Sequence, residues 1–421
     1  MKNRLREDII EAGKFGRDPQ RRVERYEDLD VERGVNRPEG TEANAQLRRF
    51  AIERMKDAAL TVTVDQFGNI FGSMEGSKAG KKSIMCGSHL DSVINGGQFD
   101  GALGVFSAIE SVRRLQDERF NSKRPIEIVA FTGEEGSSFD VNLIGSAALT
   151  GQLDPDKALS TKNARGQTLE EILLEIGFKG EDKKKLDDVE YFLELHIEQG
   201  PVLFSENTPI GIVEAITGMT WLVATIRGIS NHAGTTPMAL RKDALVAAAE
   251  VVTFVHNRAN EMVASLGSST VGTTGRLAVF PNGTNIVPGK VELGIDVRDV
   301  SLNNMKNLKD DIIHFLKELE SKHGVKADVE IPFIHSPVPL SEDLIKLIES
   351  AAQETGVKYR KMNSGAGHDA QNIASKLKTG MIFVPSVDGI SHSPMEWTHW
   401  EDIEKGVQVL TQTLKFLSEA Q

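Results

Sequence analysis

The chain has a single cysteine, Cys86, among its 421 residues. One cysteine cannot form an intramolecular disulfide, so the fold does not depend on an oxidising compartment, and we expect a cytoplasmic protein in which Cys86 is a small buried hydrophobic residue. The sequence also lacks any uncharged apolar run of about 18 residues, and its charged first residues are followed by no apolar segment. We therefore predict neither a membrane span nor a targeting segment.

Basic residues are outnumbered, because 49 Lys and Arg face 61 Asp and Glu, which gives a formal net charge of −12. A protein that binds phosphate backbones needs a basic surface, so nucleic acid is not an expected partner. Hydrophobic residues make up 39% of the chain, which is ample for a sizeable core. At about 150 residues per domain, the length predicts two or three domains.

Strand and helix patterns alternate along much of the chain. Short β-branched runs and apolar runs predict strands, and apolar residues at helical spacing predict helices between them. The main elements are predicted at 44–58 (helix, followed by a hairpin), 83–90 (strand), 101–115 (helix), 126–133 (strand), 189–197 (strand) and 380–386 (strand). Such alternation indicates an α/β fold with a parallel or mixed sheet covered on both faces.

After Pro209 the pattern changes to a strand, a helix, two strands and a helix, which is typical of a βαββα-like unit. We predict that residues 209–330 form a smaller α+β domain for dimerisation or lid closure, inserted into one α/β domain made of 1–208 and 331–421. Alternation along the second of the two strands places Arg298 on the face opposite four apolar residues. Those four residues are Val291, Leu293, Ile295 and Val297.

The motif GSHLDSVINGGQFDG contains His89, Asp91 and Asp100. His89 and Asp91 lie two residues apart near the carboxyl end of a predicted strand, where open α/β sheets place their sites. A carboxylate beside a histidine fixes the ring's tautomer and raises its basicity as a metal ligand. Asp100 precedes a helix and offers a hard oxygen ligand. Taken one at a time, these residues have ordinary alternatives as a helix cap or a core histidine.

The motif VAFTGEEGSSF ends an apolar strand in the adjacent acids Glu134 and Glu135. Two neighbouring carboxylates repel each other unless a cation or protons separate their roles. A ligand beside a general base is what metal-assisted hydrolysis needs, and an exposed acidic turn is the alternative. His196 in FLELHIEQGPVL and His392 in VDGISHSPMEW add two strand-end histidines. The candidate ligands of a dinuclear site are His89, Asp100, Glu135, His196 and His392.

Taken in order, these motifs closely resemble those of the N-carbamoyl-L-amino-acid amidohydrolase, allantoate amidohydrolase and β-ureidopropionase group. That group belongs to the aminoacylase and carboxypeptidase superfamily of dinuclear metallohydrolases, and the resemblance runs from about Val35 to Leu417. It implies a homodimer that binds two divalent metal ions per subunit, which are zinc, manganese, cobalt or nickel, and a small ureido or N-acyl amino acid as substrate.

The resemblance implies that the five candidate ligands hold the two ions with Asp100 bridging, that Asp91 orients His89, and that Glu134 is the general base. It also implies a set of substrate-binding residues: Gln199, His232, Asn285, Arg298, Gly367 and His368. Within that set, His232 reaches the active site of the partner subunit and polarises the scissile carbonyl, while Arg298 and Asn285 bind the substrate's carboxylate. Without the resemblance, His232 is an ordinary turn residue, and Arg298 forms a surface ion pair with Asp296 or Asp299.

We therefore expect a metal-dependent hydrolase that cleaves the C–N bond of an N-carbamoyl (ureido) L-amino acid. The alternatives are an N-acyl-amino-acid amidohydrolase or a dipeptidase on the same scaffold, and a catalytically silent metal-binding subunit. The silent subunit has no need for an acid such as Glu134 outside the ligand set, and a dinuclear phosphoesterase needs more cationic residues near the ligands. The segment before Val35 departs from the family pattern, and we expect it to line the mouth of the pocket.

Overall fold

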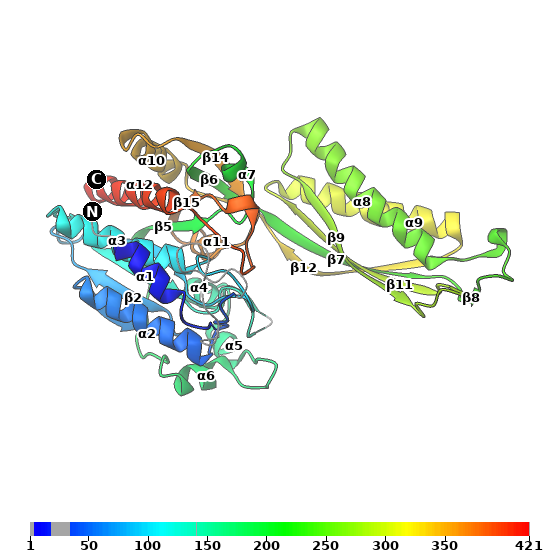
Figure 1. The fold of residues 1–421 in the computed structure, drawn as a ribbon, viewed down its shortest axis with the longest axis horizontal. Coiled ribbons are helices and arrows are strands. Elements are labelled where there is room, and N and C mark those ends of the chain that lie inside the picture. Colours follow the sequence, from blue (N-terminus) through cyan, green and yellow to red (C-terminus); the bar gives the residue numbers. More distant parts are fainter. Residues whose placement is uncertain (1–3, 18–33, 140, 421) are drawn as a thin grey trace. The chain divides into compact units, whose positions relative to one another are not determined.

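A computed structural model of the protein describes residues 4–17, 34–139 and 141–420 (Figure 1). Of the segment expected to line the pocket mouth, residues 1–3 and 18–33 lie outside these described residues. The chain divides into two compact units, the first made of Met1–Glu214 with Leu340–Gln421 and the second of Ala215–Pro339. Among the described residues, every helix is too short or too polar to cross a membrane.

The first unit is built on a mixed sheet with the strand order β1-β2-β4-β3-β5-β15-β6-β13, in which β14 also pairs with β6. The strands are β1 (Thr61–Val64), β2 (Ile70–Met74), β3 (Ser83–His89), β4 (Ile126–Phe131), β5 (Val189–Ile197), β6 (Ile210–Ile216), β13 (Val338–Pro339), β14 (Tyr359–Ser364) and β15 (Lys378–Val384). The central neighbours β4, β3, β5 and β15 run parallel, whereas β2 and β6 join them antiparallel. The predicted mixed-sheet α/β class is confirmed.

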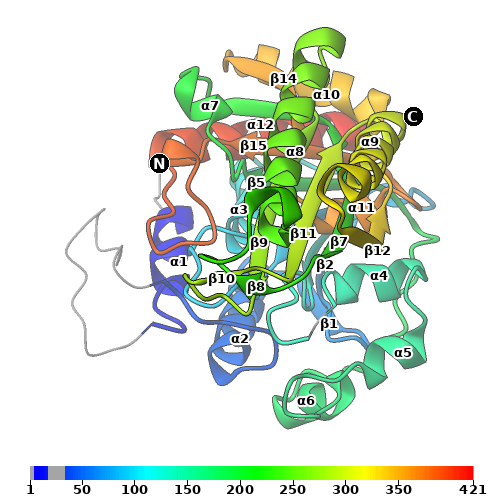
Figure 2. The same cartoon turned by 90° about the vertical axis from the view of Figure 1, so that its right-hand side faces the viewer.

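The four parallel strands are almost wholly buried, which explains why they read as continuous apolar runs rather than alternating ones. The helices of the first unit are α1 (Arg4–Ala12), α2 (Glu42–Asp57), α3 (Ala102–Asp117), α4 (Ile144–Thr150), α5 (Pro155–Ser160), α6 (Leu169–Glu175), α7 (Val202–Ser205), α10 (Glu342–Glu354), α11 (Asp369–Ile373) and α12 (Trp400–Glu419). Helix α12 packs on α3 and α10, and α11 packs on α4, β5 and β15 (Figures 1 and 2).

Helix α3 begins directly behind the sheet edge that carries the candidate ligands. Gly101 precedes it with a φ of +63°, a conformation that favours glycine. A Cβ at this position would lie 2.4 Å from ring atoms of His89, so a side chain there would clash with the ring. The sequence Asp-Gly therefore lets the start of the helix approach the end of β3 closely. Cys86 is buried within β3, as predicted.

The second unit is a four-stranded antiparallel sheet, with the order β12-β7-β11-β9, and two long helices. Its elements are β7 (Gly218–Arg227), β8 (Asn231–His232), α8 (Ala244–Leu266), β9 (Val271–Phe280), β10 (Ile286–Val287), β11 (Lys290–Asp299), α9 (Leu302–His323) and β12 (Lys326–His335). Val291, Leu293, Ile295 and Val297 lie in its core, on the face predicted for them. The edge strand β12 was not predicted, because none of its residues is buried and its charged positions resemble a loop.

Candidate metal centre

The parallel strands deliver their candidate ligands to one edge of the first unit's sheet. His89 is the last residue of β3, and His196 is the last but one of β5. Both side chains are buried, with 1% of each residue exposed. The Nδ1 atom of His89 lies 3.2 Å from the carbonyl oxygen of Asp91, and that of His196 lies 2.9 Å from the carbonyl oxygen of Ile197. Donation from Nδ1 leaves a lone pair on each Nε2 to serve as a ligand atom. In the structure, Nε2 of His196 accepts the backbone N–H of Gly101 at 3.3 Å.

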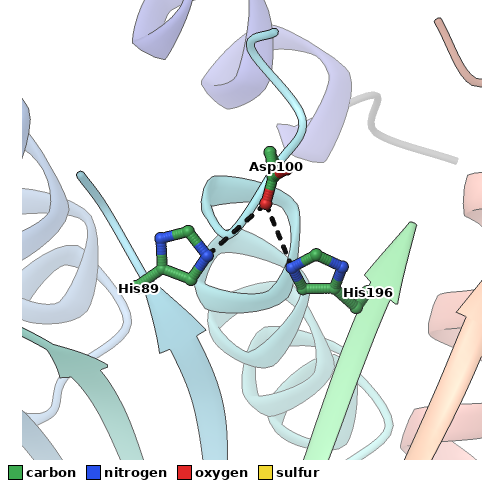
Figure 3. A group of neighbouring side chains, drawn as sticks. All are labelled: His89, Asp100 and His196. Atoms are coloured by element: carbon green, nitrogen blue, oxygen red, sulfur yellow. Dashed lines mark ion pairs between the residues drawn. The ribbon is translucent and has the colours of Figure 1, made fainter. Parts of the chain in front are cut away.

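The carboxylate of Asp100 lies between the two histidines (Figure 3). Its Oδ1 is 3.5 Å from Nε2 of His89 and 3.2 Å from Nε2 of His196. One ligand atom from each of these three residues lies within 4.8 Å of the others, so the group can hold a metal ion. All three residues are buried, and they offer the two nitrogens and one oxygen that suit a divalent transition metal.

The second oxygen of Asp100 belongs to another group of three. Its Oδ2 lies 3.4 Å from Nε2 of His392, and the same nitrogen lies 3.4 Å from Oε2 of Glu135. Asp100, Glu135 and His392 can therefore hold a second ion, and the two groups share Asp100. Oε1 of Glu135 is buried without a hydrogen-bond partner among the described residues, as expected of an oxygen that takes a cation. The donor set thus fits two divalent ions.

Glu134 stands beside this ligand set but belongs to neither group. Its Oε2 is 3.8 Å from Nε2 of His89, and the residue is buried.

Asp91 has a wider role than the sequence suggested. Its Oδ1 lies 3.5 Å from Nδ1 of His89, and its two oxygens also accept the backbone N–H groups of Glu134 and Glu135, at 3.1 Å each. Asp91 therefore fixes both the histidine and the acidic turn.

Burial and the crowding of carboxylates shift the pKa values at this site. Burial, with smaller contributions from Glu135, Asp369 and Asp91, raises the pKa of Glu134 well above its usual range. Burial and the neighbouring Asp100 raise the pKa of Glu135 to about 8. Hydrogen bonding to Asp100 raises the pKa of His392 to about 9, against the effect of burial. Without a cation, Glu135 and His392 therefore hold protons near neutral pH.

The affinity of the metal-free protein for Zn²⁺ is expected to rise from pH 7 towards pH 9. Metal binding needs deprotonated ligands, so at pH values below the pKa of about 8 for Glu135 and about 9 for His392 the ion that binds to Asp100, Glu135 and His392 must displace protons. Rising pH removes those protons, and the association constant should increase about tenfold per pH unit for each proton displaced. Competition with a chromophoric chelator measures it, and an affinity independent of pH over this range would contradict the assignment.

Three of the expected substrate-binding residues lie close to the ligands. Nε2 of Gln199 donates to Oδ2 of Asp100 at 2.7 Å and lies 3.3 Å from Nε2 of His392. His368, which follows Gly367, is buried; its ring centroid is 4.6 Å from that of His196, and its Nε2 hydrogen bonds with Ser364 at 2.9 Å. His368 thus contacts a candidate ligand directly.

The other three expected substrate-binding residues lie in the second unit. His232 is exposed, and its Nδ1 accepts the N–H groups of Gly234 and Thr235 at 2.9 and 3.2 Å. Ala233, the residue after His232, donates its backbone N–H to the carbonyl oxygen of Asn285 at 2.9 Å. Asn285 and His232 therefore lie in neighbouring segments. The remaining residue, Arg298, forms a two-point ion pair with the carboxylate of Asp296, at 2.9 and 3.1 Å. This is the surface pair that the sequence offered as an alternative.

A buried ion pair that sequence reasoning missed supports the acidic turn. Oε2 of Glu39 accepts the N–H of Gly133 at 3.0 Å and pairs with Arg48 at 2.9 Å. Arg48 also donates to the Thr132 hydroxyl at 2.9 Å. With the two bonds of Asp91, three successive N–H groups at 133–135 therefore donate to carboxylates. Glu39 lies 94 residues from Gly133, so no local motif marks it.

Glu39→Ala is expected to lower the free energy of unfolding by about 3–5 kcal/mol, because it leaves the guanidinium of Arg48 buried without its counter-ion. Glu42→Ala is the matched control, since it removes a surface pair with Arg49 and should cost at most about 1 kcal/mol. Urea unfolding of the two variants beside wild type measures the difference. Equal losses of unfolding free energy in the two variants would show that the buried ion pair stabilises the protein no more than the surface pair does.

Comparison with known proteins agrees with this geometry. Residues 85–415 match the family model of Peptidase family M20/M25/M40. The N-carbamoyl-L-amino-acid amidohydrolase of Pseudomonas sp. (strain NS671) is 37% identical over 419 residues, which cover 98% of this chain and 97% of that protein. The allantoate amidohydrolase of Escherichia coli (strain K12) is 33% identical over 375 residues, which cover 89% of each protein.

A solved structure from Burkholderia multivorans, described as an amidase of the hydantoinase/carbamoylase family, shares the fold with a TM-score of 0.91. It is 34% identical and covers 98% of this chain and 96% of its own. The protein is therefore an amidohydrolase that acts on carbon–nitrogen bonds other than peptide bonds. It belongs to Peptidase family M20/M25/M40 and, within that family, to the hydantoinase/carbamoylase amidases.

Proposed function

We propose that this protein hydrolyses the C–N bond of an N-carbamoyl (ureido) L-amino acid or a related ureido acid, with Glu134 as general base. The observation that carries the proposal is the pair of three-ligand groups that share Asp100, beside an acid that belongs to neither. The relatives that act on N-carbamoyl-L-amino acids and on allantoate support the substrate class. The products from an N-carbamoyl substrate are the amino acid, ammonia and carbon dioxide.

In this mechanism the five candidate ligands His89, Asp100, Glu135, His196 and His392 would hold two divalent ions. Bound there, the ions would supply the positive charge that lowers the pKa of a water molecule. Glu134 accepts a proton from that water as it attacks the ureido carbonyl carbon, and then delivers the proton to the leaving nitrogen. Asp91 accepts hydrogen bonds from the backbone N–H groups of Glu134 and Glu135. These bonds fix the backbone of the acidic turn, so that Glu134 can act as the base while Glu135 acts as a ligand.

The second unit supplies the remaining groups of the proposal. Because Nδ1 of His232 accepts two N–H groups, the neutral ring carries its proton on Nε2, which is a donor suited to the developing oxyanion. Arg298 offers a planar guanidinium and Asn285 an amide for the substrate's carboxylate. The substrate would then replace Asp296 as the partner of Arg298.

His232→Ala is expected to lower kcat by about 10²–10³-fold, the effect of removing one donor to an oxyanion, with metal content unchanged. Steady-state kinetics together with elemental analysis of the metal measure both quantities. His314→Ala is a matched control, because His314 is an exposed histidine of α9 and should leave kcat unchanged. A His232→Ala variant with wild-type kcat would remove this residue from the mechanism.

We also propose that the chain works as a homodimer, with the second unit as the interface. Strand β9 is the edge of its sheet, so its outer N–H and C=O groups are open to another strand. Large apolar side chains are exposed on β9 and on α8: Val246, Val252, Val263, Leu266, Val271, Leu277 and Phe280. Analytical ultracentrifugation tests the proposal, and a monomer at micromolar concentration would contradict it.

The substrate proposal is tested with a panel of N-carbamoyl, N-formyl and N-acetyl L-amino acids and dipeptides. The metal-free protein is reconstituted in turn with Zn²⁺, Mn²⁺, Co²⁺ and Ni²⁺, since this ligand set suits all four. We expect release of ammonia from N-carbamoyl substrates at the highest kcat/KM. A preference for acetyl substrates or dipeptides would instead favour an aminoacylase or a dipeptidase, and inactivity on every substrate would favour a silent metal-binding subunit.

The single buried cysteine agrees with a cytoplasmic setting.

A further inference from the structure

Glu396 is a buried carboxylate that joins two loops, each carrying a candidate ligand. It lies between His392 and the start of α12, and only 3% of the residue is exposed. Its Oε1 accepts the backbone N–H groups of Phe99 and Asp100, at 2.9 and 3.1 Å. Its Oε2 accepts the hydroxyl of Ser391 at 3.0 Å. One side chain thus holds the backbone of Asp100 and the residue next to His392.

Two further contacts tighten this junction. The hydroxyl of Ser391 also lies 3.2 Å from Oδ2 of Asp100, the oxygen that faces His392. Gly97 lies directly against the Glu396 carboxylate, since a Cβ there would be 2.0 Å from the carboxyl carbon. The loop before Asp100 therefore rests on Glu396 with no space between them, although Glu396 and Asp100 are 296 residues apart.

The two metal positions differ in their support. His89 and His196 are buried on strands, and each is held by a backbone carbonyl. His392 lies in a loop with a φ of +52°, and its side chain is 49% exposed. Its placement therefore depends more on contacts that tie the loop down, and Glu396 makes such a contact beside it.

We infer that Glu396 is a positioning residue that holds the loops of Asp100 and His392 together, and that the metal position of Asp100, Glu135 and His392 depends on it. The position of His89, Asp100 and His196 depends on it far less, because its histidines stand on strands. Asp100 keeps other support, since its carbonyl accepts the N–H of Ala102 at the start of α3. The inference rests on the dinuclear site of the proposed function.

The test is titration of the metal-free full-length protein with Zn²⁺ against a chromophoric chelator, for wild type, Glu396→Ala and Glu396→Gln. We expect wild type to bind two ions. Glu396→Ala should bind one ion with unchanged affinity and the other about 10–100-fold more weakly, the effect of losing a group that supports a ligand. Glu396→Gln should restore the affinity for the second ion to within a few-fold of the wild-type value. Its side-chain carbonyl oxygen can accept the two N–H groups, and its amide group can donate to Ser391.

Glu127→Ala is the matched control, since Glu127 is another buried glutamate of the first unit, paired with Ser83 and Lys184, and should leave both affinities unchanged. Gly97→Ala is a second variant, which keeps the carboxylate of Glu396 but places a methyl group against it. This variant should also bind one of the two ions more weakly. Anomalous diffraction from Glu396→Ala crystals should place the remaining ion on His89, Asp100 and His196.

The outcomes separate the inference from the proposed function. A wild type that binds two ions, with a Glu396→Ala variant that keeps both at wild-type affinity or loses both equally, would overturn the inference alone. A wild type that binds fewer than two ions would overturn the dinuclear site and the inference with it. If Glu396→Ala does not fold, unchanged binding of both ions by Gly97→Ala overturns the inference in its place.

Discussion

Glu134→Gln is expected to abolish measurable turnover while two metal ions stay bound. Glutamine keeps the size of the side chain but cannot accept a proton at its oxygen, and a positioned general base contributes about 10²–10⁴-fold to the rate. Glu134 belongs to neither three-ligand group, so its replacement leaves the five ligands in place. The loss should therefore fall on kcat, with little change in KM or in metal content.

Steady-state kinetics and elemental analysis of the same Glu134→Gln preparation test this separation. Glu135→Gln is the informative control, because it changes the neighbouring acid, which lies 3.4 Å from His392 and is a candidate ligand. The control should lose one ion, whereas Glu134→Gln should keep both. An active Glu134→Gln variant would remove the general base from the mechanism, and loss of an ion would make Glu134 a ligand.

Asp100→Asn is expected to weaken both metal positions at once. The two oxygens of Asp100 face different groups, Oδ1 towards His89 and His196 and Oδ2 towards His392. An amide offers one neutral oxygen and one N–H₂ group, so it cannot serve two cations. We expect each affinity to fall by at least about 100-fold, the upper end of the effect of losing a supporting residue, and turnover to disappear.

Zn²⁺ titration of Asp100→Asn beside His392→Ala distinguishes a shared ligand from an ordinary one. His392→Ala removes a ligand of one group only, so it should bind one ion with nearly unchanged affinity. An Asp100→Asn variant that binds one ion tightly would show that the carboxylate serves a single position. The two positions would then be independent of each other.

The sequence predicted the elements that position the site because its candidate ligands follow a rule that is local in the chain. Each motif couples an apolar strand to a polar side chain at or just beyond the strand's end, and parallel strands bring such ends to one edge. His89 and His196 illustrate this directly, since both stand at the ends of strands whose residues are nearly all buried. Because β3 and β5 are parallel neighbours in the sheet, the two histidines at their ends both reach Asp100.

The supporting groups could not be predicted in the same way. Glu39 and Glu396 accept N–H groups from residues 94 and 296 positions away, and neither stands in a pattern that marks such a contact. The strand β12 escaped detection because an edge strand with one open face shows little apolar signal. Arg298 shows a different limit, because alternation placed it on the correct face but left both Asp296 and Asp299 open as partners, and only the structure selects Asp296. The catalytic role of His232 and the substrate-binding role of Asn285 stay predictions.

Anomalous diffraction from crystals of the Zn²⁺-loaded protein tests the central claim most directly. We predict two peaks about 3.5–4 Å apart, the separation usual in two-metal sites, with one Asp100 oxygen directed to each. His89 and His196 should contact one ion, Glu135 and His392 the other, and Glu134 neither. A single peak, or a Glu134 oxygen at bonding distance from either ion, would contradict the account.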